Sequence, residues 1–188
     1  HLHWPWNDVE VTGLIERGRL GVDVFFILSG FILTHVYHRQ IEEGRYSHFR
    51  FMVARFARIY PMHLAALLFM GAMVVGAGAL GAEFDATRYD LQGFATTAFL
   101  THAWVPVTGV VTQWNGPSWT LSAEWFAYLT FPAFAWAGLK LRTRPVTLLA
   151  AAILLFALCD LLYQAWFGKI LPHAEDNVGI LRIIPEFL

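Results

Sequence analysis

The chain of 188 residues has a single cysteine, Cys159, and it lies inside an apolar run. One thiol cannot form an intramolecular disulfide framework or supply a cluster of thiolate metal ligands. We therefore expect Cys159 to be a buried, inert thiol, and we predict no metal site. The formal net charge of −1 shows no basic excess, so the composition gives no indication of a nucleic-acid partner.

Charged residues are also scarce, at 14% of the chain, whereas soluble domains carry about a quarter. Hydrophobic residues make up 57%, and the mean hydropathy is +0.50. A helix needs about 20 mainly apolar residues to span a bilayer. Four windows meet that requirement: 20–37, 59–82, 118–139 and 146–168. The predicted fold class is all-α, a polytopic bundle of transmembrane helices.

A fifth window, residues 91–112, has no charged residue but is interrupted by two glycines and a proline. Lysine and arginine gather in two predicted loops, 38–58 and 140–144, and such loops are typically cytoplasmic. Both can face the cytoplasm only if residues 91–112 do not cross the membrane completely. We therefore predict that this segment is re-entrant or interfacial.

The sequence shows no internal repeat, no low-complexity tract and no linker. One membrane-embedded domain covering residues 1–188 is therefore expected. The chain begins with His1 rather than Met, and residues 180–188 look like the start of another apolar segment. We expect this domain to be truncated at both ends.

Asp23 needs an explanation, because a carboxylate at the centre of a membrane helix costs about 2.5–3.5 kcal/mol. It stands near the start of GVDVFFILSGF, residues 21–31. The window boundary predicts that Asp23 lies in the first turn of its helix, where it can cap free backbone N–H groups. Ser29 and Gly30 are small and predict close approach of a neighbouring helix, an interpretation we favour over a nucleophilic serine.

Glu124 follows an Asn-Gly-Pro-Ser turn in which Ser118 is a natural helix N-cap. It lies nearly two turns into the helix, too deep for capping. We predict that its side chain faces the bundle interior and has a polar partner there.

Arg55 and Arg58 are one helical turn apart and should project to one side of their helix. Paired guanidinium groups suit contacts with phosphates, and plain anchoring at the cytoplasmic face is the alternative. His63 follows at the same depth as a polar interfacial residue. His1 and His3 are candidates for a general base because histidine titrates near neutral pH.

Three blocks of the sequence, taken in this order, resemble the acyltransferase-3 family of integral-membrane acyltransferases. They are GVDVFFILSGF at 21–31, RFARIYP at 55–61 and SWTLSAE at 118–124. The resemblance implies transfer of an acyl group, usually acetyl, from cytoplasmic acyl-CoA to a hydroxyl of a cell-envelope or exported carbohydrate. It also implies a multi-pass protein of the bacterial cytoplasmic membrane.

Carried over position by position, the resemblance implies a catalytic role for His1 and Glu124. Asp23 would orient His1 or balance a charge, and Arg55 and Arg58 would hold the acyl-CoA donor. His1 would act as general base on the acceptor hydroxyl, and an acyl-histidine intermediate is an open alternative. His1, Asp23 and Glu124 would gather toward the outer half of the membrane, and the pantetheine arm would reach them from the arginines.

Two other classes remain open at this point. One is a transporter or lipid-handling membrane protein, in which carboxylates and histidines form an intramembrane proton or substrate path. The other is a structural membrane subunit. A transporter is disfavoured because the sequence shows no paired, interrupted repeats.

Overall fold

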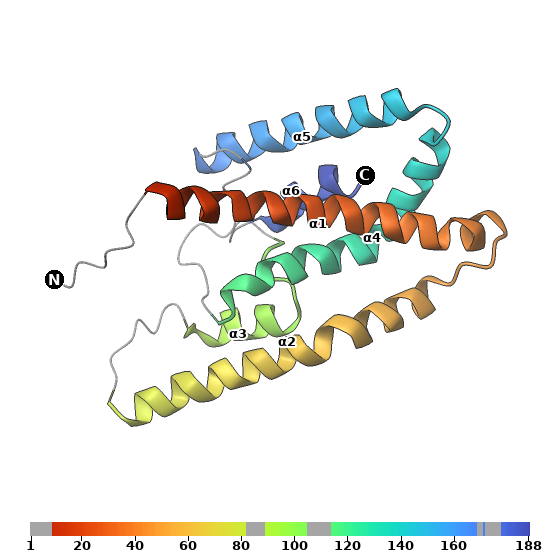
Figure 1. The fold of residues 1–188 in the computed structure, drawn as a ribbon. Helices are drawn as coiled ribbons and strands as arrows, with labels where there is room; N and C mark the ends of the chain where they lie inside the picture. The colour runs from red at the N-terminus through yellow and green to blue at the C-terminus, as the bar shows by residue number, and fades with distance from the viewer. Residues whose placement is uncertain (1–8, 82–88, 105–113, 169–170, 172–177) are drawn as a thin grey trace.

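A computed structural model describes residues 9–81, 89–104, 114–168, 171 and 178–188. Its elements are α1 (Val9–Glu42), α2 (His48–Ala79), α3 (Leu91–Ala98), the 3₁₀ turn η2 (Gly116–Ser118), α4 (Trp119–Leu141), α5 (Pro145–Phe167) and α6 (Gly179–Glu186). No strand occurs in these residues. The predicted all-α class is confirmed (Figure 1).

Among the described residues, three helical stretches are long and apolar enough to cross a membrane: Gly21–Glu42 within α1, the whole of α2, and α5. They correspond to three of the four predicted windows. The fourth window forms α4, which at 23 residues and about 1.5 Å per residue is about 34 Å long. It is not one of those three stretches, and it packs against other helices, with seven buried residues that include Ala123, Ala127 and Ala135.

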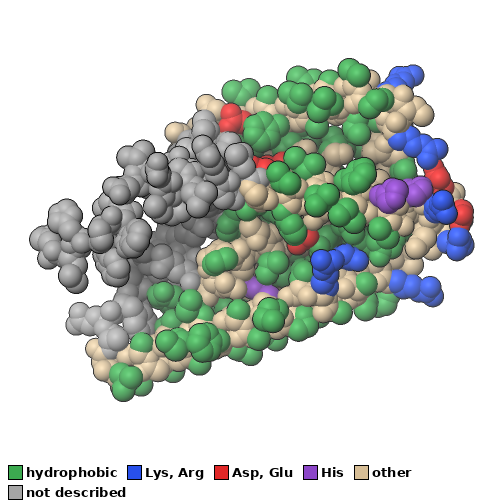
Figure 2. Space-filling model, viewed as in Figure 1, with side chains coloured by type: hydrophobic (Ala, Val, Ile, Leu, Met, Phe, Trp, Pro, Cys, Tyr) green, Lys and Arg blue, Asp and Glu red, His purple; other side chains and the backbone are tan. Residues whose placement is uncertain are grey.

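The four long helices alternate in direction, so the α1–α2 and α4–α5 connections lie at the same end of the bundle (Figure 1). An ion pair between Arg142 and Glu42 joins the two connections, and basic side chains gather at this end in Figure 2. The prediction that the two basic loops lie on the same side is confirmed, because both connections lie at one end of the bundle (Figure 1). The first connection is shorter than predicted, because α2 already begins at His48. That this end faces the cytoplasm stays a prediction.

The described part of the fifth window does not cross the membrane as one helix. Helix α3 has eight residues, about 12 Å, against a hydrocarbon core of about 30 Å. Just after the end of α3, Leu100 has a left-handed φ of 56°. The Thr101 amide bonds the Thr96 carbonyl at 2.9 Å and closes the helix end. Residues 105–112 lie outside the described part.

Helix α1 begins at Val9, so Asp23 lies fourteen residues, about four turns, into it. The prediction that Asp23 caps the first turn is therefore wrong. The physical reason is that residues 9–19, which include four charged residues, continue the helix beyond the apolar window. Hydropathy marked the part of α1 suited to the hydrocarbon core, not the point where the helix starts.

Helix α6 packs against α1, α4 and α5 (Figure 1). A Cβ added to Gly30 of α1 would lie 2.4 Å from the Phe187 carbonyl oxygen, directly after α6. A Cβ added to Gly179 would lie 3.1 Å from that of Ala123. The prediction that Gly30 permits close approach is confirmed, and its neighbour is the segment predicted as the start of a further apolar stretch.

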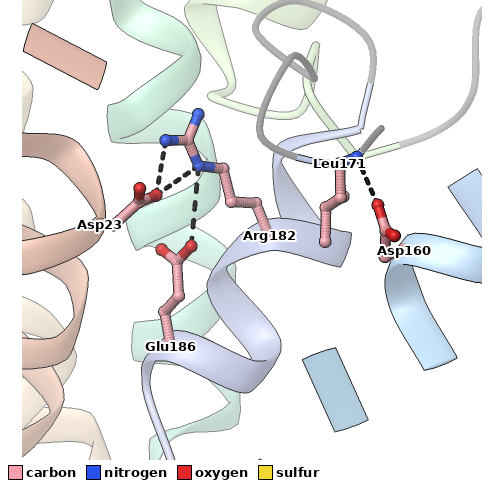
Figure 3. Close-up of polar contacts among 5 residues, drawn as sticks. All are labelled: Asp23, Asp160, Leu171, Arg182 and Glu186. Atoms are coloured by element: carbon pink, nitrogen blue, oxygen red, sulfur yellow. Dashed lines mark hydrogen bonds and ion pairs between the residues drawn. The ribbon is translucent and has the colours of Figure 1, made fainter. Parts of the chain in front are cut away.

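Cys159 and Asp160 of α5 both make contacts that stabilise the fold. Cys159 is buried in a small apolar cluster with Tyr163 and Val178, as expected. Asp160 accepts a hydrogen bond from the Leu171 amide at 2.7 Å (Figure 3) and another from Gln164 at 2.6 Å. This carboxylate therefore ties the chain after α5 back to that helix.

Candidate functional site

A cavity of about 350 Å³ lies among α1, α2 and α4. Its polar lining consists of Arg58 and His63 from α2, Asn115, and Glu124 and Tyr128 from α4. The remaining wall is apolar. Figure 2 shows acidic and basic side chains close together on the face between α1 and α2, among hydrophobic ones. Opposite charges beside an apolar wall are typical of a binding site for a small molecule.

Glu124 is 4% exposed and lies in the second turn of α4. Its carboxylate accepts hydrogen bonds from the Tyr128 hydroxyl, one turn later on the same face, and from the Ser29 hydroxyl of α1 at 3.5 Å. The prediction that Glu124 faces the interior and has a polar partner is confirmed. Two donors hold this carboxylate in place at the edge of the cavity.

Arg55 and Arg58 lie on one side of α2, as predicted, and both are near enough to Glu124 to act on its charge. The Arg55 guanidinium lies 5.7 Å from the Phe51 ring centroid and 5.9 Å from that of Tyr128. Its Nε is buried and has no hydrogen-bond partner among the described residues. Arg58 lines the same cavity as Glu124, so the structure brings these two side chains together more closely than the sequence analysis expected.

Asp23 faces a different partner. Its Oδ1 accepts from Arg182 of α6, at 2.7 Å from Nε and 2.5 Å from Nη2 (Figure 3). The Arg182 side chain is 1% exposed, stacks over the Trp119 ring at 5.5 Å, and also lies 3.7 Å from Glu186. Asp23 does not line the cavity, so within the described residues it balances a buried charge.

Arg182 was not among the candidates predicted from the sequence. The signal was present, since a lone arginine in the apolar stretch 180–188 needs an acidic partner inside a membrane. The apolar pattern of that stretch predicts only the start of a further segment and gives no indication of the partner of Arg182.

His63 is 2% exposed and lines the cavity, and its Nε2 lies 2.9 Å from the Thr97 carbonyl oxygen of α3. The prediction of a merely interfacial histidine does not fit that burial. No sequence motif marked it, because its partner lies 34 residues away.

Next to His63 lies His102, whose Nε2 is 3.1 Å from the Ser118 hydroxyl. Burial, together with the proximity of His63, lowers the pKa of His102 to about 4. Ser118 stands at the N-cap of α4 as predicted, but its hydroxyl donates to the Asn115 carbonyl at 2.6 Å and makes no capping bond to α4. Asn115 in turn lines the cavity.

His1 and His3 lie outside the described residues, so the role of His1 stays a prediction. Within the described ranges no group of three or more His, Cys, Asp or Glu side chains is arranged to hold a metal ion.

The family of the chain follows from its similarity to known proteins. A family model described as an acyltransferase domain, acyltransferase 3, matches residues 1–182. The chain belongs to the acyltransferase-3 family. The match covers the three sequence blocks and every polar side chain that lines the cavity.

Three relatives illustrate the range of the family. The acyltransferase MdmB of Streptomyces mycarofaciens is 32% identical over 146 residues, which is 76% of this chain. The exopolysaccharide production protein ExoZ of Rhizobium meliloti is 32% identical over 114 residues, 61% of this chain. The peptidoglycan O-acetyltransferase OatA of Listeria monocytogenes is 28% identical over 163 residues, 81% of this chain.

The chain spans 35% of MdmB, 33% of ExoZ and 24% of OatA. Helices suited to a bilayer and membership of a membrane acyltransferase family make it part of a multi-pass membrane protein. No solved structure matches it.

Proposed function

We propose that this chain is the membrane-embedded domain of an O-acyltransferase, which moves an acyl group, acetyl in the first instance, from acyl-CoA to a hydroxyl of a cell-envelope or exported carbohydrate. Family membership supports acyl transfer. The names of two relatives, a peptidoglycan O-acetyltransferase and an exopolysaccharide production protein, support a carbohydrate acceptor. We also propose that the membrane is the cytoplasmic membrane of a bacterium.

The observation that supports this most is the cavity shared by Arg58 and Glu124. A CoA thioester carries phosphates at one end and an acyl group at the other. Arg58 and Arg55 offer guanidinium groups that suit phosphates, and Arg55 has an Nε with no partner among the described residues. The apolar wall of the cavity can contact the pantetheine arm of the donor. The Glu124 carboxylate can accept a hydrogen bond from an acceptor hydroxyl beside the thioester.

In the proposed reaction the acceptor hydroxyl oxygen attacks the carbonyl carbon of the thioester. A base removes the hydroxyl proton, the C–S bond breaks, and the CoA thiolate leaves and takes up a proton. We assign the base to His1 and the orientation of the hydroxyl to Glu124. We assign Asp23 a positioning role through Arg182, because their ion pair fixes α6 against α1. Holding both substrates in one cavity converts a bimolecular step into an effectively unimolecular one.

The test is transfer of labelled acetyl from acetyl-CoA to cell-envelope glycans, in membranes containing the full-length parent protein. Arg58→Gln and Glu124→Gln should abolish most transfer. Arg50→Gln is the matched control, because Arg50 lies on the same helix and is not among the residues lining the cavity. We expect that variant to retain parental transfer.

Two results would contradict the proposal. The first is equal transfer in parent membranes and in empty membranes with several acyl-CoA donors and with acceptors present. That outcome would favour the transporter or lipid-handling class. The second is equal loss in the Arg50 and Arg58 variants, which would mean that any reduction of positive charge on α2 impairs the protein.

A further inference from the structure

His63 carries a buried ring nitrogen for which the acyl-transfer scheme has given no use. The ring belongs to α2, and its Nε2 lies 2.9 Å from the Thr97 carbonyl oxygen of α3. A carbonyl oxygen only accepts hydrogen bonds, so Nε2 must carry the proton of this contact. In the neutral imidazole, Nδ1 is then an acceptor with a free lone pair.

That lone pair has no donor among the described residues. Nδ1 of His63 is buried and has no hydrogen-bond partner in the described part of the chain, although buried polar atoms are nearly always paired. The residue is at the same time part of the cavity wall, with Arg58, Glu124 and Tyr128. A fixed tautomer, an unpaired acceptor and a cavity occur together at this one side chain.

The position of His63 along α2 shows which part of a ligand would reach it. Arg55, Arg58, Met62 and Ala66 recur at helical spacing, and all but Arg55 line the cavity. His63 lies five residues beyond Arg58, about 7.5 Å further along the helix from the basic end. A ligand whose phosphates contact the arginines would therefore bring its uncharged portion to His63.

We propose that Nδ1 of His63 accepts a hydrogen bond from an O–H or N–H group of the molecule that fills the cavity, which makes His63 a substrate-binding residue. The inference rests on the proposed function for the identity of that molecule. The pantetheine arm of acyl-CoA offers amide N–H groups and a hydroxyl, and a carbohydrate acceptor offers hydroxyls. Kinetics distinguish these two sources.

Two substitutions separate the nitrogens of the ring. In His63→Gln the side-chain amide reaches the position of Nε2, so it can still donate to Thr97 while the acceptor at Nδ1 is gone. In His63→Asn the side-chain amide lies near the position of Nδ1, so an acceptor remains while the bond to Thr97 is lost. The purified full-length protein and both variants are compared by thermal unfolding without substrate, and by KM for acetyl-CoA, KM for the glycan acceptor and kcat.

We expect His63→Gln to unfold within about 2 °C of the parent and above His63→Asn, because Nδ1 has no partner to lose among the described residues. We expect it to raise one KM roughly five- to tenfold, the effect of one hydrogen bond. A raised KM for acetyl-CoA assigns the bond to the donor, and a raised KM for the glycan assigns it to the acceptor. His63→Asn should retain a KM closer to that of the parent.

Unchanged KM values and kcat in His63→Gln would overturn the assignment. So would a His63→Gln protein that unfolds at a lower temperature than His63→Asn, because Nδ1 would then have a partner within the protein. A parent that transfers no acetyl would contradict the proposed function instead. In that case the unfolding temperatures, and the thermal shift caused by CoA alone in the parent and in His63→Gln, still decide the role of His63.

Discussion

Arg182 and Asp23 form an ion pair between α6 and α1, with the arginine fully buried and the aspartate partly exposed (Figure 3). Both Nε and Nη2 of the arginine contact Oδ1 of the aspartate. The pair explains why an apolar run begins with a carboxylate, since each charge is costly in a membrane without the other. It also fixes α6 against the helix whose Ser29 contacts Glu124.

Removing the arginine of this pair should destabilise the protein more than removing the charge of the aspartate. Arg182→Met leaves both Asp23 and Glu186 without their shared cation, whereas Asp23→Asn leaves Arg182 with Glu186. An uncompensated buried charge costs about 3–5 kcal/mol. We expect both variants to unfold at lower temperature in detergent, and Arg182→Met more so. The reverse order would show that Glu186 does not share the arginine.

Loss of the Tyr128 hydroxyl should impair activity more than loss of the Ser29 hydroxyl. Both donate to Glu124, but the Ser29 contact is long at 3.5 Å. A hydrogen bond to a charged group is worth about 1.5–3 kcal/mol, so Tyr128→Phe should lower kcat/KM about tenfold or more. Ser29→Ala should lower it by less. Equal activity of Tyr128→Phe and the parent would mean that this bond does not position Glu124 for the reaction.

Gly30 and Gly21 form a matched pair on one helix. A Cβ at position 30 would collide with the Phe187 backbone, while one at position 21 meets nothing within 4 Å. Overpacking costs about 1–3 kcal/mol, whereas glycine to alanine in an open helix interior gains about 0.5–1 kcal/mol. Gly30→Ala should therefore lower the unfolding temperature and Gly21→Ala should raise it slightly. Similar losses in both would contradict the close packing of α6 on α1.

Acidification should weaken the fold through His102, which lies outside the three long apolar helices. Its pKa is about 4 in the folded protein, below the ordinary value of 6.5. The unfolded chain therefore binds more protons between these values, and stability falls as the pH drops from about 6.5 toward 4. In His102→Gln, which can still donate to Ser118, the unfolding temperature should fall less over this range. An equal fall in parent and variant would assign the effect to other groups.

Local patterns predicted part of this site correctly. Glu124 was placed in the interior because its distance from the Asn-Gly-Pro-Ser turn sets its depth in the helix. Gly30 was placed at a close helix contact because it is small within an apolar run. Both arguments use only neighbours in sequence, and the structure confirms them.

What the sequence could not predict depends on distant pairing. Asp23 with Arg182 and His63 with Thr97 are contacts between separate elements, and a single sequence does not reveal which elements meet. The start of α1 was missed for another reason: hydropathy measures suitability for lipid, while the backbone hydrogen bonds of a helix continue through polar residues. Hydropathy also does not indicate that part of α4 is buried against neighbouring helices.

The distance along the chain between Asp23 and Arg182 has a consequence for biosynthesis. Ribosomes add about 5–20 residues per second, so the 159 residues between the two side chains take about 8–30 s to make. During that interval α1 is already synthesised, and its carboxylate has no arginine to meet. Until α6 emerges, Asp23 therefore lacks the cation that it contacts in the folded protein. Synthesis of Arg182 thus sets the earliest moment at which this ion pair can join α6 to α1.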